Sequence, residues 1–218
     1  TNYPLFVTSG GDIMAFFNNV GIYKMRLDRN GLTQQLIMTS GLEVTSMAEG
    51  YHSDIWVGTN KGIHRIDMSN LNLERKGYFL DEEITCIFSN GYNVYAGTKS
   101  GRIVSFAYGQ EPKVLKEVGE TITSLYVDSY GLIWYSDQHD GVNKFDLQTG
   151  TTKNFAQRIL VPVHDSKGST ISETMGTVWI SMNHGGYGYY NRETDEVEYF
   201  HNDPSNPWNL SNSVNASL

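Results

Sequence analysis

Long hydrophobic runs, cysteine and proline are all scarce in this sequence of 218 residues. A helix that crosses a membrane needs about 20 consecutive apolar residues, and the apolar patch between Arg158 and His164 is far shorter. The sequence therefore predicts that this chain does not itself insert into a membrane. The lone cysteine, Cys86, cannot form a disulfide within the chain, so cysteine usage does not indicate an oxidising or a reducing compartment.

Basic residues are also few. Sixteen Lys and Arg against 24 Asp and Glu give a net charge of −8, whereas proteins that bind nucleic acids present clustered Lys and Arg. The six histidines have none of the short spacings of a zinc site, and no nucleophile, P-loop or dinucleotide motif is present. We therefore expect no nucleic-acid partner, no metal, no cofactor and no catalytic residue in this chain.

The most informative feature of the sequence is an internal repeat. Five segments share an apolar stretch with one bulky residue, a polar turn, a glycine and a second apolar stretch. They begin at Ile13, Ile55, Val94, Ile133 and Val178. Their spacing of about 40 residues is typical of radial or stacked repeat architectures.

Each repeat has the pattern of β-strands. Apolar and polar residues alternate over short runs that are rich in Val, Ile, Tyr, Phe, Trp and Thr, and clusters of Gly, Asn, Asp and Ser separate these runs. Helical periodicity is absent. Four antiparallel strands in a unit of this size are typical of a β-propeller blade, so the sequence predicts an all-β protein, a β-propeller of about five four-stranded blades.

The predicted blades cover residues 1–37, 38–79, 80–117, 118–156 and 157–201, and residues 202–218 begin a further blade. The chain begins at Thr1 without methionine or a signal-peptide pattern, and it ends inside the first strand of that further blade. A closed ring has no use for a single extra strand. We therefore expect a fragment of a larger ring, of seven blades, that exposes unpaired blade surfaces at its ends.

One position in the second strand of each unit carries a bulky side chain. The side chains at this position are Met14, Trp56, Tyr95, Trp134 and Trp179. The four aromatic residues could form a set that stacks on sugars. We favour packing between neighbouring blades, because a residue that recurs in every unit serves packing better than it serves a single binding site.

Two of these segments also resemble a known repeat. Asp54–Asp67 (DIWVGTNKGIHRID) almost intact, and Gly131–Asp146 in variant form, match the two-component regulator propeller repeat. The stretch His201–Leu218 is similar to the connector between blades in the same family. The chain departs from the family pattern at Asp137 and at Ser181, where Gly-Thr has become Ser-Asp and Ser-Met.

The resemblance implies a function as well as a fold. Proteins with this repeat are mostly hybrid two-component sensors of gut-dwelling Gram-negative bacteria. Their periplasmic propellers detect glycans or oligosaccharides and, through a membrane helix, govern a cytoplasmic histidine kinase and a phosphorelay. The resemblance therefore implies a non-catalytic, periplasmic sensing propeller that binds an oligosaccharide or other small ligand. Its parent would be a homodimeric receptor anchored in the inner membrane.

The sequence also suggests where a ligand would bind. In a four-stranded blade, the turns between the second and third strands lie on the same side as the connectors between blades. This face gathers a mixture of Asp, Asn and His that suits hydroxyl-rich ligands. The predicted ligand-binding residues are Asp137, His139, Asp140, His164, Asn183 and His184. Alternatively, these residues are polar only because turns are polar, or those between Asp137 and Asp140 bind a cation.

Two other functions remain open from the sequence. Streptogramin-lyase-like and lactonase-like enzymes share the aromatic blade signature, and a histidine on the predicted ligand face would then act as a general base. A scaffold for protein interactions is the third possibility, because a propeller fold does not specify its function. The enzyme hypothesis is weakened because no acid–base pair can be placed from the sequence.

Overall fold

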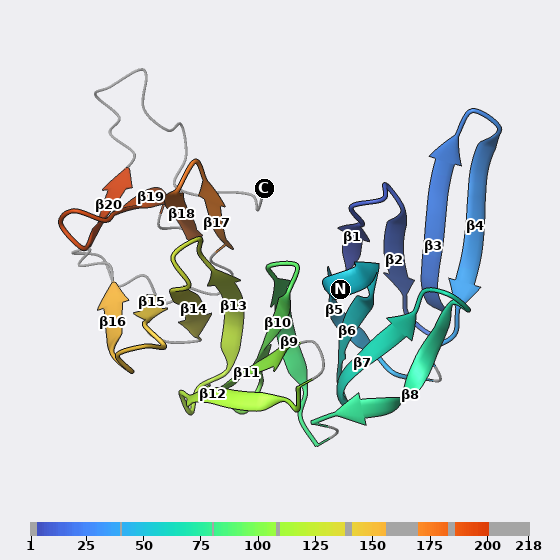
Figure 1. The fold of residues 1–218 in the computed structure, drawn as a ribbon, viewed down its shortest axis with the longest axis horizontal. Coiled ribbons are helices and arrows are strands. Elements are labelled where there is room, and N and C mark those ends of the chain that lie inside the picture. Colours follow the sequence, from blue (N-terminus) through green and yellow to red (C-terminus); the bar gives the residue numbers. More distant parts are fainter. Residues whose placement is uncertain are drawn as a thin grey trace. The chain divides into compact units, whose positions relative to one another are not determined.

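The computed structural model describes residues 4–39, 41–79, 81–107, 110–137, 141–155, 170–182 and 186–200. Within these ranges the chain forms β-strands, turns and one short 3₁₀ turn, Tyr51–Ser53. The strands make five four-stranded antiparallel sheets, as the sequence predicts. The chain divides into two compact units, Thr1–Gly119 with three sheets and Glu120–Leu218 with two (Figure 1).

Each sheet is a meander in which strands adjacent in sequence pair with each other. In unit 1 the first sheet contains β1 (Leu5–Val7), β2 (Ile13–Phe17), β3 (Gly21–Asp28) and β4 (Gly31–Ile37). The second contains β5 (Val44–Glu49), β6 (Ile55–Thr59), β7 (Gly62–Asp67) and β8 (Asn72–Tyr78). The third contains β9 (Ile84–Ser89), β10 (Asn93–Thr98), β11 (Arg102–Ala107) and β12 (Lys113–Glu117).

Unit 2 repeats this arrangement with two sheets. The fourth sheet contains β13 (Ile122–Val127), β14 (Ile133–Asp137), β15 (Val142–Phe145) and β16 (Thr152–Phe155). The fifth contains β17 (Thr170–Thr174), β18 (Thr177–Met182), β19 (Gly186–Asn191) and β20 (Glu196–Phe200). Consecutive sheets within a unit meet through their first strands, β5 against β1 and β9, and β17 against β13.

The cores lie between consecutive sheets. Met14 and Phe16 of the first sheet pack with Ile55 and Val57 of the second in one cluster. A second cluster joins the second and third sheets, and a third joins the fourth and fifth. Because side chains alternate between the two faces of a strand, the second sheet contributes one apolar face to each of its two neighbours. This explains why the strands of the second sheet are apolar on both faces.

The first strand of three sheets contains a β-bulge at the same place. The register skips Thr45 in β5, Thr85 in β9 and Thr123 in β13, so each threonine is the extra residue on its strand. Opposite the first bulge, a Cβ built on Gly58 would approach Ile84 of the third sheet to 2.7 Å. The small residue at this position therefore allows the two sheets to approach closely.

The bulky position of the second strand behaves largely as the sequence predicts. Met14 and Trp134 are fully buried, and Tyr95 is nearly so. Trp134 packs on Tyr190 of the fifth sheet with ring centroids 4.8 Å apart, and Trp56 packs similarly on Phe106 of the third. Packing between sheets is confirmed for these two tryptophans. Trp179 differs, because 39% of its surface is exposed among the described residues.

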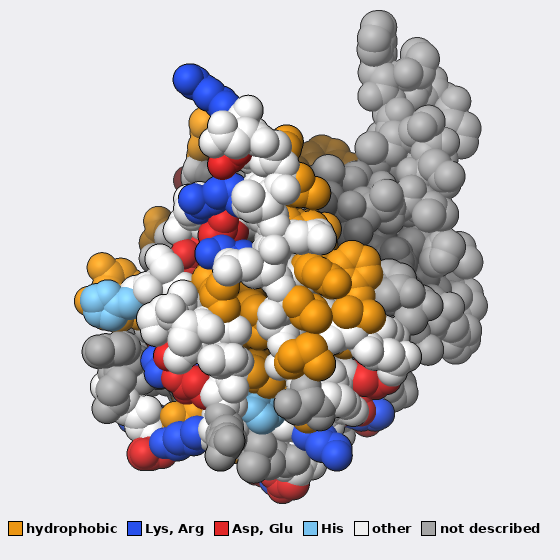
Figure 2. All heavy atoms as spheres, turned by 90° about the vertical axis from the view of Figure 1, so that its right-hand side faces the viewer, with side chains coloured by type: hydrophobic (Ala, Val, Ile, Leu, Met, Phe, Trp, Pro, Cys, Tyr) orange, Lys and Arg blue, Asp and Glu red, His pale blue; other side chains and the backbone are white. Residues whose placement is uncertain are grey.

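The first sheet has an apolar outer face. Leu5, Val7, Phe17 and Leu36 are between 42% and 68% exposed, and the strand register places them on the face opposite Met14. Figure 2 views the molecule from the side on which β3 and β4 lie and shows hydrophobic side chains gathered there. This face of the first sheet is therefore apolar and partly exposed to solvent.

Candidate functional site

Only one of the six predicted ligand-binding residues lies within the described part of the chain. His139, Asp140, His164, Asn183 and His184 lie outside it. Asp137, at the end of β14, is 5% exposed, and its carboxylate accepts a hydrogen bond from the Asn143 amide at 3.1 Å. Ligand binding by this set of six residues therefore stays a prediction.

The environment of Asp137 explains the departure from the repeat. Asp137 takes the register position that Thr59 and Thr98 hold in the second and third sheets. Both threonine hydroxyls accept a backbone N–H of the following turn, from Lys61 at 3.0 Å and from Arg102 at 2.9 Å. Burial, together with the negative charge of Asp137, raises the pKa of the neighbouring Tyr135 to about 12. The Asp137 carboxylate thus lies at a buried position where, in the second and third sheets, a threonine hydroxyl holds the following turn.

Unit 1 contains a cleft of about 410 Å³ between the second and third sheets. We call it the inter-sheet cleft. The residues that line it include Tyr51, Asp54, Trp56, Arg65, Glu74, Lys76, Tyr92, Phe106 and Glu111. It opens where the turns after β5 and β9 lie, on the side opposite the turns that the sequence analysis favoured. Its volume falls within the range of roughly 300–1,000 Å³ that is usual for small-molecule sites.

Aromatic rings form two parts of the cleft wall. At the rim, Tyr51 and Tyr92 stack with centroids 5.7 Å apart and an angle of 29° between their planes. Deeper, Trp56 packs on Phe106 at 5.3 Å. A Cβ on Gly50 would lie 2.8 Å from the indole of Trp56, so the glycine lets this ring lie against the backbone. The tryptophan therefore has a fixed position in the wall.

The charged residues of the cleft are mostly paired. Arg65 Nη1 donates to Asp54 Oδ2 at 2.9 Å, and its Nη2 donates to Glu74 Oε1. The hydrogen bond that Arg65 donates to Glu74, with the charge of Asp54 beside it, outweighs burial and raises the pKa of Arg65. Lys76 lies over the Tyr78 ring at 4.9 Å and forms no ion pair with the described residues. The wall thus offers fixed planar polar groups beside aromatic faces.

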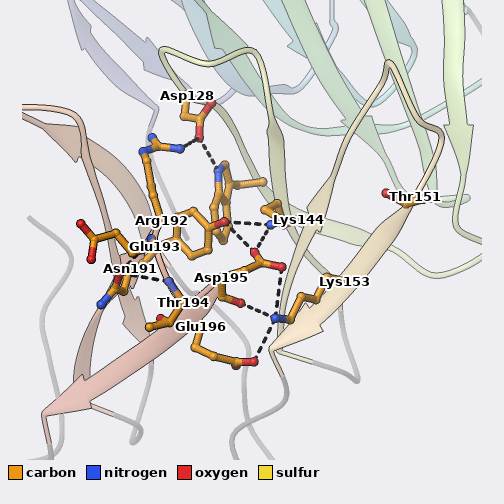
Figure 3. A network of polar contacts seen from close by, with 12 residues as sticks. Asp128, Lys144, Thr151, Lys153, Asn191, Arg192, Glu193, Thr194, Asp195 and Glu196 are labelled. Atoms are coloured by element: carbon orange, nitrogen blue, oxygen red, sulfur yellow. Dashed lines mark hydrogen bonds and ion pairs between the residues drawn. The ribbon is translucent and has the colours of Figure 1, made fainter.

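The corresponding location in unit 2 is filled by a polar network (Figure 3). Lys144 pairs with Trp134 across β14 and β15, as Arg65 pairs with Trp56 across β6 and β7. Lys144 Nζ donates to the Tyr190 hydroxyl at 2.9 Å and also to Asp195 of the fifth sheet. Lys144 thus links two sheets, whereas Arg65 is held only within its own sheet.

A second group of polar contacts links the same two sheets. Asp128 Oδ2 accepts the Trp134 indole N–H at 3.0 Å and Arg192 Nη1 at 3.1 Å. Arg192 also pairs with Glu173 at 3.3 Å, and Glu173 accepts two hydrogen bonds from Ser129. The Asp128 side chain is fully buried, so these contacts stabilise it where water does not reach.

The Asp195 contacts predict a pH-dependent stability. Partial burial opposes ionisation, but hydrogen bonds from Lys144, Tyr190 and Lys153 lower the pKa of Asp195 from 3.8 to about 2. A carboxyl whose pKa is lower in the folded state stabilises the fold fully at pH values above its pKa in the unfolded chain. This stabilisation is lost as the pH falls through its pKa in the folded state. We expect Asp195→Asn to be less stable than wild type at pH 5 and the difference to shrink toward pH 2, as measured by urea denaturation.

The matched control for this prediction is Glu193→Gln in the same turn. Glu193 is exposed and forms no ion pair with the described residues. The Glu193→Gln substitution should therefore leave the urea midpoint unchanged at both pH values. A difference between wild type and Asp195→Asn that stays constant from pH 5 to pH 2 would contradict the assignment.

Other reactive groups are few in the described part of the chain. No group of three or more His, Cys, Asp or Glu residues there is placed to hold a metal ion. Burial raises the pKa of the Cys86 thiol to about 11, which leaves it protonated and a poor nucleophile at neutral pH. Within the same ranges, no helix has the length and apolar character that crossing a membrane requires.

Five consecutive four-stranded meanders of this kind define a β-propeller, and known structures share the fold. The extracellular domain of BT4673 from B. thetaiotaomicron, assigned as a hybrid two-component system, matches 96% of the chain with a TM-score of 0.68 and 15% identity. That of BT3049, a second such system, matches 97% with a TM-score of 0.60 and 14% identity. The chain spans 31% and 36% of the length of these two domains.

A lyase shares the fold as well. A catalytically inactive virginiamycin B lyase from Staphylococcus aureus, crystallised with quinupristin, matches 92% of the chain and 69% of its own length, with a TM-score of 0.71 and 17% identity. No family model and no curated protein matches the sequence. At these identities the likeness establishes the propeller fold, which is the fold that the two-component regulator resemblance implies.

Proposed function

We propose that this chain is part of the periplasmic sensing propeller of a hybrid two-component receptor. The proposal is carried by one observation: the segment that matches the two-component regulator repeat, Asp54–Asp67, forms β6 and β7 of a propeller sheet. The extracellular domains of BT4673 and BT3049 have the same fold and support this assignment. Ligand binding by the propeller would signal to a cytoplasmic histidine kinase in a homodimeric, membrane-anchored parent.

The ligand that we propose is a glycan or oligosaccharide, bound without catalysis. In the inter-sheet cleft, Asp54 and Glu74 both accept hydrogen bonds from Arg65. A general acid and a general base must be free to exchange a proton with substrate, and these two carboxylates are committed to the guanidinium. The predicted residues Asp137, His139, Asp140, His164, Asn183 and His184 belong to this proposal as a second contact face.

A sensor binds its ligand and leaves it unchanged. We expect an oligosaccharide from the parent organism's habitat to raise the melting temperature of the chain in a concentration-dependent manner, because a ligand that binds only the folded state stabilises it. Chromatography of the oligosaccharide after overnight incubation should show no product. Turnover of the sugar would refute the sensor proposal, as would a parent gene that encodes no membrane helix and no kinase.

A propeller lyase is the second candidate, favoured by the fold that the chain shares with virginiamycin B lyase. Incubation with quinupristin, followed by liquid chromatography coupled to mass spectrometry, separates the two proposals. The sensor proposal expects quinupristin to remain intact, whereas a lyase would convert it to a product of altered chromatographic mobility.

A further inference from the structure

We propose that the inter-sheet cleft binds one neutral pyranose ring of a saccharide. This inference rests on the proposed sensing function and adds to it a site on the opposite side of the sheets from the predicted residues. The cleft belongs wholly to unit 1 and is lined by residues of the second and third sheets. A sugar bound there would contact both sheets at once.

The aromatic residues give the cleft a surface for the apolar face of a sugar ring. Tyr92 is 72% exposed, and its ring is supported from behind by Tyr51. A rigid, exposed aromatic ring supplies a large contact area at a small cost in conformational entropy. Farther in, Trp56 lines the wall, and its indole N–H has no acceptor among the described residues.

The polar residues favour a neutral ligand. Two carboxylates, Asp54 and Glu74, balance the two cations Arg65 and Lys76, and Glu111 adds a further negative charge at the exposed edge. An acidic sugar would meet three carboxylates in this space, and like charges repel. Sugar hydroxyl groups, in contrast, can donate to the carboxylate oxygens that do not bond Arg65. They can also accept hydrogen bonds from the guanidinium and ammonium groups.

The location that corresponds to the cleft differs between the fourth and fifth sheets. Tyr190 in the fifth sheet and Phe106 in the third occupy equivalent positions in the third strand of their sheets. Each directly follows the residue that pairs with the bulky position of the second strand. The Tyr190 hydroxyl accepts from Lys144 and donates to Asp195, which fills the space between the fourth and fifth sheets. Phe106 has no hydroxyl, so the equivalent space in unit 1 has no such bridge.

The turn at the rim is also unusual. His52 and Ser53, which directly follow Tyr51, have φ values of 57° and 60°, whereas the corresponding turn of the fourth sheet uses a glycine, Gly131, at positive φ. Left-handed conformations of residues other than glycine are costly and are concentrated at binding sites. Tyr51, which lines the cleft, directly precedes these two residues.

The test uses the 218-residue chain with maltotriose, cellotriose and mannotriose as neutral probes and trigalacturonate as the acidic one. Isothermal titration calorimetry measures affinity, and hydrogen exchange with mass spectrometry locates the site. Tyr92→Ala removes the exposed ring, and Tyr130→Ala is its matched control. Tyr130 is 69% exposed in the equivalent turn of the fourth sheet and lies outside the cleft.

We expect at least one neutral trisaccharide to bind and to protect the backbone amides of residues 51–54 and 92–94. Tyr92→Ala should weaken that binding about tenfold, the loss of one stacking contact, and Tyr130→Ala should leave it unchanged. The assignment is overturned if none of the three binds, if trigalacturonate binds more tightly than all three, or if Tyr92→Ala keeps wild-type affinity. Binding elsewhere on the chain would overturn the assignment of the cleft as the sugar site and leave the sensor proposal intact. Turnover of the trisaccharide would overturn the sensor proposal.

Discussion

We expect Trp134→Ala to lower the free energy of unfolding of the chain by about 3–5 kcal/mol, the range for deleting a large buried aromatic side chain. Trp134 is fully buried between the fourth and fifth sheets. Its ring packs on Phe155 at 5.7 Å and on Tyr190 at 4.8 Å. The substitution leaves a cavity and removes one donor to Asp128. Urea denaturation, followed by circular dichroism, measures the loss.

Trp179→Ala is the matched control, because Trp179 holds the same strand position in the fifth sheet. It is 39% exposed and contacts Tyr189 of its own sheet. We expect a loss of about 1 kcal/mol or less, as for most exposed substitutions. Equal losses for the two tryptophans would show that burial between sheets does not account for the stability of unit 2.

The second large effect is expected for Asp128→Ala. The buried carboxylate of Asp128 accepts hydrogen bonds from Arg192, from the Trp134 indole and from the backbone amides of Tyr130 and Leu132. Its removal leaves a partly buried guanidinium without this partner and several donors unsatisfied, which typically costs about 3–5 kcal/mol. Urea denaturation at pH 7 measures the effect.

Asp146→Ala provides the comparison for this substitution. Asp146 also accepts backbone amides of its own turn, from Gln148 at 2.8 Å and Thr149 at 3.3 Å, and it bonds no other sheet among the described contacts. We expect about 1 kcal/mol, the usual net value of such hydrogen bonds. If Asp128→Ala costs no more than Asp146→Ala, the contacts between sheets contribute nothing measurable.

The two pairs of sheets therefore differ in how they are joined. The fourth and fifth sheets are linked by side-chain contacts that involve Lys144, Asp195 and Arg192. In the inter-sheet cleft the charged side chains pair within their own sheet. Aromatic rings join the two walls of the cleft. A ligand that contacts both walls would add polar contacts between the two sheets, and a ligand shifts a conformational equilibrium only through such differential contacts.

The strand pattern followed from the sequence. The environment of Asp137, which was predicted to bind a ligand, did not. As part of a polar turn on the face that also carries the connectors between blades, it was predicted to contact a ligand. In the fold it is a buried residue bonded to Asn143 at a position that organises turns in other sheets. The exposure of a turn side chain depends on neighbouring strands, and the local sequence does not specify it.

The inter-sheet cleft was missed for a related reason. The tryptophans at the bulky position, Trp56 and Trp134, pack between sheets as predicted. Because the same role was predicted for both, there was no reason in the sequence to expect a cleft beside Trp56 alone. The available signal was the contrast between Phe106 and Tyr190 at equivalent positions. A comparison of the repeats at that position would have indicated which pair of sheets lacks a bridging hydroxyl.

The sequence by itself determined the all-β class, the four-stranded unit and the position of the bulky residues. These follow from alternation, strand composition and turn residues, all of which act over a few neighbouring positions. Only the tertiary structure decided which interface is closed by ion pairs and which is open as a cleft. That outcome depends on side chains of different sheets meeting across an interface, and whether they meet is set by packing and register, which no single repeat encodes.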